Sequence, residues 1–381
     1  MVDGRLQKNP RNRAYLVIVQ TWQRSKDFLE ESEHEMKELT EAAAVKVMGY
    51  SMAHVPQPSP SHFIREGKLT EVRDKAKAAG ANVLFFNSEL TPAQARNIEA
   101  FTKIPAVDRT GLILEIFGRR AKTREGKLQV ELARLNYLLP RLGGLGGVMS
   151  RLGGGVGTRG PGETELEWDR RKIRNRIKRV KEDLDGVLRH RSLLRSGRKK
   201  KHFISAVLVG YTNAGKSTLL NSLTGASSYV EDKLFATLDP MTRLQTVNGR
   251  HDILFTDTVG FLRDLPHTLI KSFHATLEEV TTADVLIHVL DAAHPKAQDL
   301  KSAVEAVLKD IGAEEKPVIL ALNKADLLTE DEKKRVLSNW PDGILISAKD
   351  KLGLQSLTLK IEEMAGQNPL FRDAPSGEPQ E

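Results

Sequence analysis

The chain has 381 residues, of which 28% are charged; its formal net charge is +8 and it contains no cysteine. This length exceeds one ordinary hydrophobic core and favours two or three domains. The missing cysteines exclude disulfides, thiolate metal sites and prenyl or palmitoyl anchors. The apolar run within the first twenty residues is too short for a signal peptide or a membrane span, so we expect a cytoplasmic protein without a stable membrane anchor.

The positive charge is concentrated in the middle of the chain. Residues 119–201 contain 24 Lys or Arg and 9 Asp or Glu, a net charge of +15, so the remainder of the chain carries −7. Charge gathered in one segment favours a polyanionic partner for that segment, either a nucleic acid or an anionic membrane.

Residues 12–117 alternate short apolar runs with helical periodicity. The runs YLVIV, VKVMGY and NVLFF read as strands, and residues 28–45, 68–79 and 91–102 read as helices. This order predicts a small N-terminal α/β domain with a mostly parallel sheet. Because the domain has no glycine-rich phosphate loop, we interpret it as a scaffold or docking domain rather than a second active site.

Residues 118–201 have the apolar period of a coiled coil. The apolar positions are Leu128, Leu132, Leu135, Leu139 and Leu142 in a first helix and Leu166, Ile173, Ile177, Val180, Leu184 and Val187 in a second. We expect the second helix from about Glu165 to Arg195. Neither helix can bury its apolar positions alone, so the two should form a long antiparallel helical hairpin.

The expected tip of the hairpin, residues 143–162, contains ten glycines in twenty positions. Glycine lets a backbone approach a partner's surface closely. We interpret this segment as a loop that becomes ordered on binding a partner, with slack chain as the alternative.

The second helix carries a nearly unbroken run of positive charge: Arg170, Arg171, Lys172, Arg174, Arg176, Lys178, Arg179 and Lys181. A single sign of charge beside a glycine loop favours contact with phosphates over a merely solvated face. Aromatic residues for base stacking are scarce nearby, so recognition of folded RNA by shape and charge is favoured over single strands. The RNA-contacting residues that we expect are Arg151, Arg159, Arg170, Arg171, Lys172 and Arg174.

Residues 202–366 contain four short motifs, each of which follows an expected strand. GYTNAGKST, residues 210–218, follows an apolar strand and precedes a helix, which is the context of the Walker A pattern. Gly210 and Gly215 let backbone N–H groups face phosphates at a helix N-terminus. Lys216 supplies positive charge for the β- and γ-phosphates, and Ser217 is placed to ligate Mg²⁺.

Three further motifs follow in order, each at the carboxyl end of an expected strand. Asp257 can hold Mg²⁺ through water, and Gly260 offers a backbone N–H to the γ-phosphate. Asp326 can accept hydrogen bonds from both N1–H and the 2-amino group of guanine, whereas adenine would leave its carboxylate unpaired. The Ala348 N–H is expected to be available for the guanine oxygen.

Together these motifs predict that residues 202–366 form a P-loop GTPase domain, with a GTP site at one edge of a parallel sheet. The residues expected to bind GTP are Gly210, Tyr211, Thr212, Asn213, Ala214, Gly215, Lys216, Ser217, Phe235, Ala236, Thr237, Leu238, Asp239, Asp257, Thr258, Val259, Gly260, Asn323, Lys324, Ala325, Asp326, Ser347, Ala348 and Lys349. Those expected to take part in catalysis are Lys216, Thr237 and Gly260.

The chain resembles the HflX family of ribosome-associated, translation-factor-related P-loop GTPases. The resemblance rests on GYTNAGKST, LFATLDP, DTVGF, DRTGLILEIFGRRAKTREGKLQVELARL and GTRGPGETELEWDRR, and it spans roughly residues 12–366. The chain departs from the family pattern in two places. The loop 143–156 is richer in glycine. Residues 367–381 form a polar tail that we expect to be disordered, whereas some family members have a further domain there.

The resemblance implies a GTPase that contacts the large (50S) ribosomal subunit and its rRNA, with the hairpin tip near the peptidyl-transferase region. It implies a role in ribosome dissociation, rescue or subunit biogenesis. It also implies that Thr237 is the switch threonine that joins Ser217 on Mg²⁺.

Phe261 occupies the slot in which the best-known small GTPases have a glutamine that orients the attacking water. We therefore expect slow intrinsic turnover and a contact supplied in trans by the ribosome, with His267 as a weaker candidate within the chain. In related GTPases an asparagine at the position of Asn213 helps to coordinate K⁺, so K⁺ stimulation is a further hypothesis.

Two other functions remain open. One is an RNA-binding assembly factor that holds GTP as a structural ligand with negligible turnover. The other is a membrane signalling GTPase. Two features argue against it: the apolar positions of the basic helix suit packing against another helix, and we expect no lipid anchor on the chain. We expect a monomer.

Overall fold

The computed structural model describes residues 12–21, 28–142, 165–199, 203–225, 234–247, 251–263 and 274–366. Contacts divide the chain into two compact units, Met1–Leu184 and Asp185–Glu381. Because this boundary lies inside one long helix, the finer division at 12–117, 118–201 and 202–366 stays a prediction. No helix of the described ranges is long and apolar enough to cross a membrane. The glycine loop, with Arg151 and Arg159, as well as His267 and the tail 367–381, lies outside the described residues.

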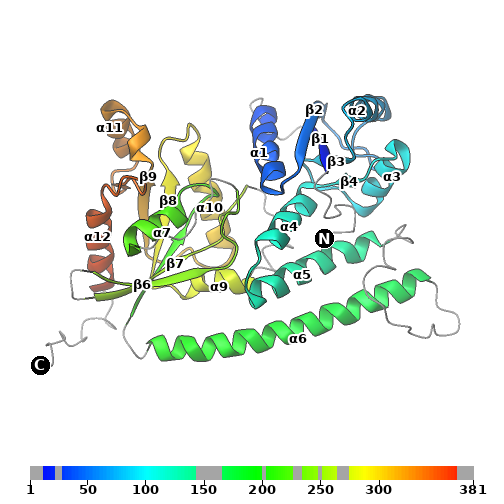
Figure 1. The fold of residues 1–381 in the computed structure, drawn as a ribbon. Helices are drawn as coiled ribbons and strands as arrows, with labels where there is room; N and C mark the ends of the chain where they lie inside the picture. Colours follow the sequence, from blue (N-terminus) through cyan, green and yellow to red (C-terminus); the bar gives the residue numbers. More distant parts are fainter. Residues whose placement is uncertain are drawn as a thin grey trace, which may run out of the picture. The chain divides into compact units, whose positions relative to one another are not determined.

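The first unit is built on a four-stranded parallel sheet with strand order β2-β1-β3-β4 (Figure 1). Its strands are β1 (Arg13–Thr21), β2 (Lys46–Val55), β3 (Val83–Phe86) and β4 (Ala106–Val107). Helices α1 (Phe28–Ala42) and α4 (Arg109–Arg120) pack on one face, and α2 (Glu66–Ala78) and α3 (Pro92–Thr102) pack on the other. The predicted α/β fold is thereby confirmed. Helix α4 was not predicted.

The helical hairpin is also present, with arms of unequal length. Its first arm is α5 (Arg124–Leu138) followed by the 3₁₀ turn η1 (Leu139–Arg141), and its second arm is α6 (Glu165–Lys199). The α-helix of the first arm ends early because Pro140 has no N–H to continue the helical bonding. Ile173, Val180 and Leu184 of α6 are buried, as the apolar period predicts. The hairpin is not an isolated pair of helices, because α5 also packs against α4.

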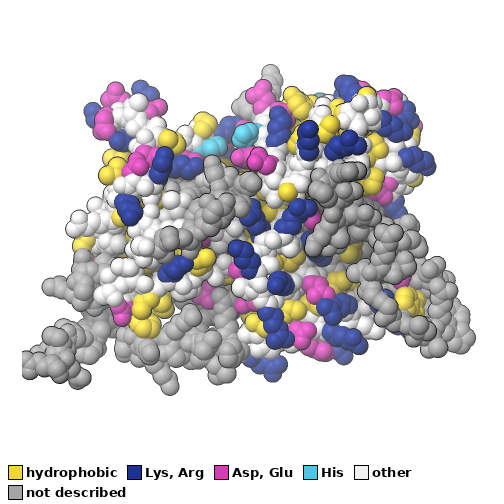
Figure 2. Space-filling model, in the orientation of Figure 1, with side chains coloured by type: hydrophobic (Ala, Val, Ile, Leu, Met, Phe, Trp, Pro, Cys, Tyr) yellow, Lys and Arg dark blue, Asp and Glu magenta, His cyan; other side chains and the backbone are white. Residues whose placement is uncertain are grey.

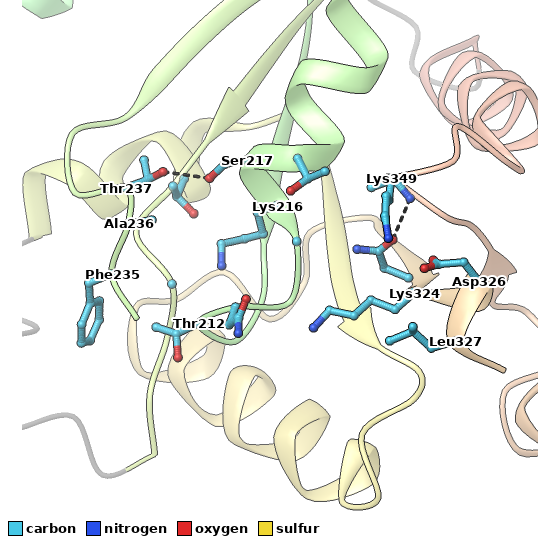
Figure 3. A pocket seen from close by; sticks show the side chains of 17 residues that line it. Thr212, Lys216, Ser217, Phe235, Ala236, Thr237, Lys324, Asp326, Leu327 and Lys349 are labelled. Carbon is cyan, nitrogen blue, oxygen red and sulfur yellow. Dashed lines mark hydrogen bonds between the residues drawn. The ribbon is translucent and has the colours of Figure 1, made fainter. Parts of the chain in front are cut away.

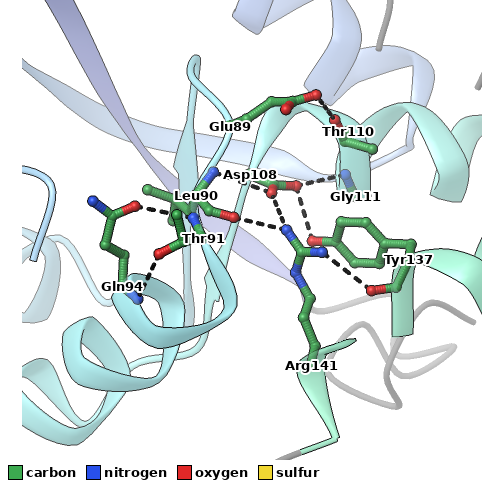
Figure 4. Close-up of polar contacts among 9 residues, drawn as sticks. All are labelled: Glu89, Leu90, Thr91, Gln94, Asp108, Thr110, Gly111, Tyr137 and Arg141. Carbon is green, nitrogen blue, oxygen red and sulfur yellow. Dashed lines mark hydrogen bonds and ion pairs between the residues drawn. The ribbon is translucent and has the colours of Figure 1, made fainter. Parts of the chain in front are cut away.

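A buried polar network joins the first arm of the hairpin to the sheet (Figure 4). The carboxylate of Asp108, at the N-cap of α4, accepts hydrogen bonds from Gly111 N (2.8 Å) and Tyr137 Oη (2.8 Å). Arg141 pairs with the same carboxylate at 2.9 Å, donates to the Leu90 carbonyl at 2.8 Å and lies over the Tyr137 ring. Because a buried carboxylate is costly unless it is paired, this network fixes the end of the first arm on the N-terminal sheet.

The second unit contains a six-stranded sheet with strand order β10-β9-β8-β5-β7-β6. Its strands are β5 (Ile204–Val209), β6 (Met241–Val247), β7 (His251–Asp257), β8 (Val285–Asp291), β9 (Val318–Asn323) and β10 (Ile344–Leu345). All neighbouring strands run parallel except the edge strand β6, which is antiparallel to β7. The predicted P-loop GTPase fold is confirmed, whereas β6 was not predicted.

Helices cover both faces of this sheet. The core on one face joins α7 (Lys216–Thr224) and α12 (Leu354–Gly366) to strand residues such as Leu208 and Val289. On the other face α10 (Ala297–Asp310) packs over Leu290 and Leu322. Two shorter helices, α9 (His274–Thr282) and α11 (Glu330–Asn339), complete the unit. Parallel strands covered on both faces leave their carboxyl ends as the open edge at which ligands bind.

One histidine lies inside this core. His288 on β8 is 2% exposed, and its Nε2 has no hydrogen-bond partner among the described residues. Burial, together with the charges of Lys301 and Lys216, lowers the pKa of His288 to about 3. In the unfolded chain the same ring would titrate near pH 6.5.

We therefore expect the stability of the second unit to fall as the solution is acidified from pH 6.5 towards pH 3. Below pH 6.5 the His288 ring takes up a proton in the unfolded chain but not in the folded chain. Acidification from pH 7.5 to pH 5 should therefore lower the free energy of unfolding by about 2 kcal/mol through this histidine. Urea unfolding at the two pH values, with His288→Leu as the comparison, measures the effect. Between the two pH values the free energy of unfolding of the leucine variant should fall by about 2 kcal/mol less than that of the wild type. An equal fall in both proteins would contradict the lowered pKa of His288.

Candidate active site

A cavity of about 460 Å³ opens at the carboxyl edge of the six-stranded sheet (Figure 3). The residues that line it are Thr212, Asn213, Gly215, Lys216, Ser217, Thr218, Phe235, Ala236, Thr237, Thr258, Gly260, Asn323, Lys324, Asp326, Leu327, Ala348 and Lys349. Five segments that are far apart in the sequence, 212–218, 235–237, 258–260, 323–327 and 348–349, therefore meet around one cavity. Sequence reasoning missed two of these residues, Thr218 and Leu327, although each directly follows a motif residue.

Nine of the expected residues do not line the cavity. They are Gly210, Tyr211, Ala214, Leu238, Asp239, Asp257, Val259, Ala325 and Ser347. Several of them support the residues that do line it. Gly210 is one example: a Cβ there would lie 2.3 Å from the Val289 carbonyl oxygen, so only glycine lets the start of the P-loop lie this close to β8. Gly215, which does line the cavity, must also be glycine: its φ is +94°, and a Cβ there would lie 2.3 Å from Asn323 Nδ2.

Lys216 begins α7 with its side chain inside the P-loop. The residue is 6% exposed, and its ammonium donates to the carbonyl oxygens of Gly210 (3.1 Å) and Tyr211 (2.8 Å). Burial lowers the pKa of Lys216 to about 8, and the carboxylate of Asp257 acts in the opposite direction. The lysine thus provides a desolvated positive charge at a helix N-terminus, which suits the phosphates of a nucleotide.

Three oxygen-bearing side chains converge beside this lysine. Ser217 Oγ donates to Asp257 Oδ2 at 2.6 Å and lies 2.8 Å from Thr237 Oγ1. Asp257 is 1% exposed; burial raises the pKa of its carboxyl group, and its Oδ1 has no hydrogen-bond partner among the described residues. One carboxylate with two hydroxyls is a donor set that fits Mg²⁺, which takes oxygen ligands and completes its shell with water and substrate phosphates.

Asn323 joins the opposite end of the cavity to the P-loop. Its Nδ2 donates to the Ala214 carbonyl (2.8 Å), and its Oδ1 accepts from Ala348 N (3.0 Å). The Ala348 N–H thus satisfies the buried amide oxygen of Asn323, and its contact with the guanine oxygen stays a prediction. Ser347 Oγ donates to Asp326 Oδ1 at 2.7 Å, which orients that carboxylate.

Phe261 does not face the cavity. Its side chain is 1% exposed, and its backbone pairs with the P-loop: Phe261 N donates to Gly210 O (3.1 Å) and Thr212 N donates to Phe261 O (2.8 Å). Gly260 is packed so closely that a Cβ would lie 2.8 Å from Thr212 Cα. The residue in the glutamine slot therefore holds the switch segment against the P-loop instead of reaching towards a substrate.

The four described residues of the expected RNA-contacting set all lie on α6. Arg171 and Arg174 are exposed, and Arg170 and Lys172 are partly exposed. Lys172 lies over the Trp168 ring, with Nζ 5.1 Å from its centroid. Figure 2 shows dark blue Lys and Arg side chains in the region where Figure 1 draws α6, with fewer magenta acidic ones among them.

Comparison with known proteins identifies the family. Three family models match consecutive parts of the chain: a GTP-binding GTPase N-terminal model over residues 30–118, a GTP-binding GTPase middle-region model over 120–198 and a 50S ribosome-binding GTPase model over 205–324.

Two curated relatives illustrate the likeness. Over 333 residues the chain is 50% identical to the GTPase HflX of Caldanaerobacter subterraneus subsp. tengcongensis, covering 87% of this chain and 77% of the relative. Over 342 residues it is 43% identical to the GTPase HflX of Escherichia coli (strain K12), covering 88% and 80%. A solved structure of the SsGBP–GDP complex is 28% identical with a TM-score of 0.51, covering 93% of this chain and 99% of that one. The chain therefore belongs to the HflX family of GTPases and is a GTP hydrolase.

Proposed function

We propose that the chain hydrolyses GTP slowly alone and rapidly on the large ribosomal subunit, where it acts in ribosome dissociation, rescue or subunit biogenesis. The observation that carries this proposal is the position of Phe261. Its ring is buried, so it cannot orient the attacking water, whereas the lysine and oxygen-bearing groups for phosphate and Mg²⁺ are in place. In some GTPases a partner supplies the missing catalytic group in trans, and we expect the same here.

The roles of the site residues follow from their positions. The P-loop, residues 210–217, cradles the α- and β-phosphates, and Lys216 neutralises charge on the β- and γ-phosphates. Ser217, Thr237 and Asp257 would hold Mg²⁺, the last of them through water, and the ion would supply charge neutralisation for the transferring phosphoryl group. The Gly260 N–H binds the γ-phosphate. At the other end of the cavity Asn323, Asp326, Ser347, Ala348 and Lys349 bind guanine.

The partner that suits the first unit is ribosomal RNA. The exposed face of α6 carries positive charge, and one family model matched here is described as that of a 50S ribosome-binding GTPase. Neutralisation of RNA phosphates by such a face gives affinity without base readout. GTP would order the segments around Thr237 and after Gly260, and hydrolysis would release them and weaken RNA binding. A monomeric protein in the cytoplasm fits this role.

Potassium is a second cofactor that we propose. Asn213 lines the cavity in the left-handed region with φ +62°, so its amide is held beside the phosphate end of the P-loop. A cation there would offset charge that develops on the γ-phosphate.

The central prediction concerns ribosomal stimulation. Large subunits titrated into the protein should accelerate phosphate release from GTP by at least about tenfold, a modest part of the range known for activation in trans. A flat response across the titration would contradict the proposal. Negligible turnover even on ribosomes would favour the alternative of an assembly factor that holds GTP as a structural ligand.

A charge-matched pair of variants tests the RNA-binding face. Arg174→Gln with Arg179→Gln removes two exposed charges from α6, and Lys334→Gln with Arg335→Gln removes two exposed charges from α11. Sedimentation with large subunits at about 0.1 M salt should show binding weakened by about tenfold or more for the α6 pair only, because phosphate contacts are lost. Equal binding by both pairs would rule out α6 as the contact face.

The potassium proposal predicts faster turnover in KCl than in NaCl. The variant Asn213→Gly keeps the left-handed backbone without strain and removes the amide, so its turnover should be the same in both salts. Phosphate release at equal ionic strength measures the difference. Equal rates for the wild type in the two salts would exclude the role of K⁺.

A further inference from the structure

The lysine of the guanine-binding segment has an ionic partner outside every motif described above. Lys324 lines the nucleotide cavity, and its Nζ lies 2.7 Å from Oδ2 of Asp291. Asp291 is the last residue of β8, and it stands opposite Asn323, the last residue of the neighbouring strand β9. The pair therefore joins the carboxyl ends of two parallel strands beside the base end of the cavity.

The backbone directs Lys324 towards this partner. Its φ is +64°, in the left-handed region that a lysine adopts only when its surroundings impose it. The residues on either side are held: Asn323 bonds to the P-loop carbonyl of Ala214, and Ala325 N donates to the Ile346 carbonyl at 3.1 Å. In Figure 3 the Lys324 side chain extends across the cavity wall towards the P-loop, and its ammonium points away from Asp326.

Asp291 is itself fixed. Its Oδ1 accepts a hydrogen bond from Ala293 N at 3.1 Å, which leaves Oδ2 for the lysine. The side chains of Asp291 and Lys324 are 16% and 27% exposed, so water screens this pair less than it screens a pair on the open surface. A long, flexible ammonium side chain is thus held by a carboxylate whose own rotamer is set by the turn after β8.

We propose that Asp291 is a positioning residue for guanine binding, an inference that rests on the guanine-binding role proposed above for Asp326. By holding the Lys324 ammonium, it keeps the aliphatic stem as an apolar wall beside the purine ring. It also keeps this ammonium from pairing with Asp326, which lines the same cavity and is the carboxylate that must accept from guanine. Without Asp291, the lysine and the base would compete for Asp326.

A double-mutant cycle on GDP binding tests this role in the isolated protein, without ribosomes. Asp291→Asn removes the charge and keeps an oxygen acceptor for the Ala293 amide. We expect it to weaken the binding of GDP and GTP by about tenfold in equal proportion, because the base end of the site is affected. In a Lys324→Met background the same change should have no further effect, because the competing ammonium is gone.

Glu363→Gln is the matched control, since Glu363 forms a 2.8 Å pair with Lys360 on α12, outside the cavity lining. It should bind GDP as the wild type does. If the asparagine variant does not fold, Asp291→Ser offers a smaller acceptor for the same comparison. The proposal is overturned if the Asp291 variant binds GDP within twofold of the wild type, or if the effects of Asp291→Asn and Lys324→Met simply multiply.

Discussion

The burial of two opposite charges, those of Lys216 and Asp257, is the constraint on which this site depends. Lys216 and Asp257 are 6% and 1% exposed, and burial acts against the charged form of each. Their mutual attraction and the Ser217 hydroxyl offset part of that cost. A phosphate beside Lys216 and a divalent cation beside Asp257 would offset the rest of that cost, which is why we propose that both bind here.

Close packing also fixes the backbone segments around Lys216 and Asp257. At Gly210 the backbone of Val289 leaves no room for a side chain, and at Gly260 the P-loop residue Thr212 leaves none. The buried ring of Phe261 and its two backbone hydrogen bonds secure the start of the switch segment. Because the Phe261 side chain is buried, it is unavailable for chemistry, and this is why we propose that a partner supplies the missing group.

The sequence predicts local motifs well and pairings between distant residues poorly. GYTNAGKST and the ends of three strands predict the cavity because each motif has a fixed local conformation at a known place on a parallel sheet. The Asp291–Lys324 pair, the Asn323–Ala348 bond and the anchoring of Arg141 on Asp108 join residues on different elements. No period or spacing encodes these contacts. Helix α4 was missed because its residues are buried almost all round, which hides a helical period.

The most direct measurement is calorimetry of a non-hydrolysable GTP analogue, with Mg²⁺ and with EDTA, on the wild type and on Ser217→Ala. If the oxygens of Ser217, Thr237 and Asp257 form the metal site, Mg²⁺ should tighten binding to the wild type by about tenfold or more, and the alanine variant should lose most of that gain. The same Mg²⁺ dependence in both proteins would contradict the account.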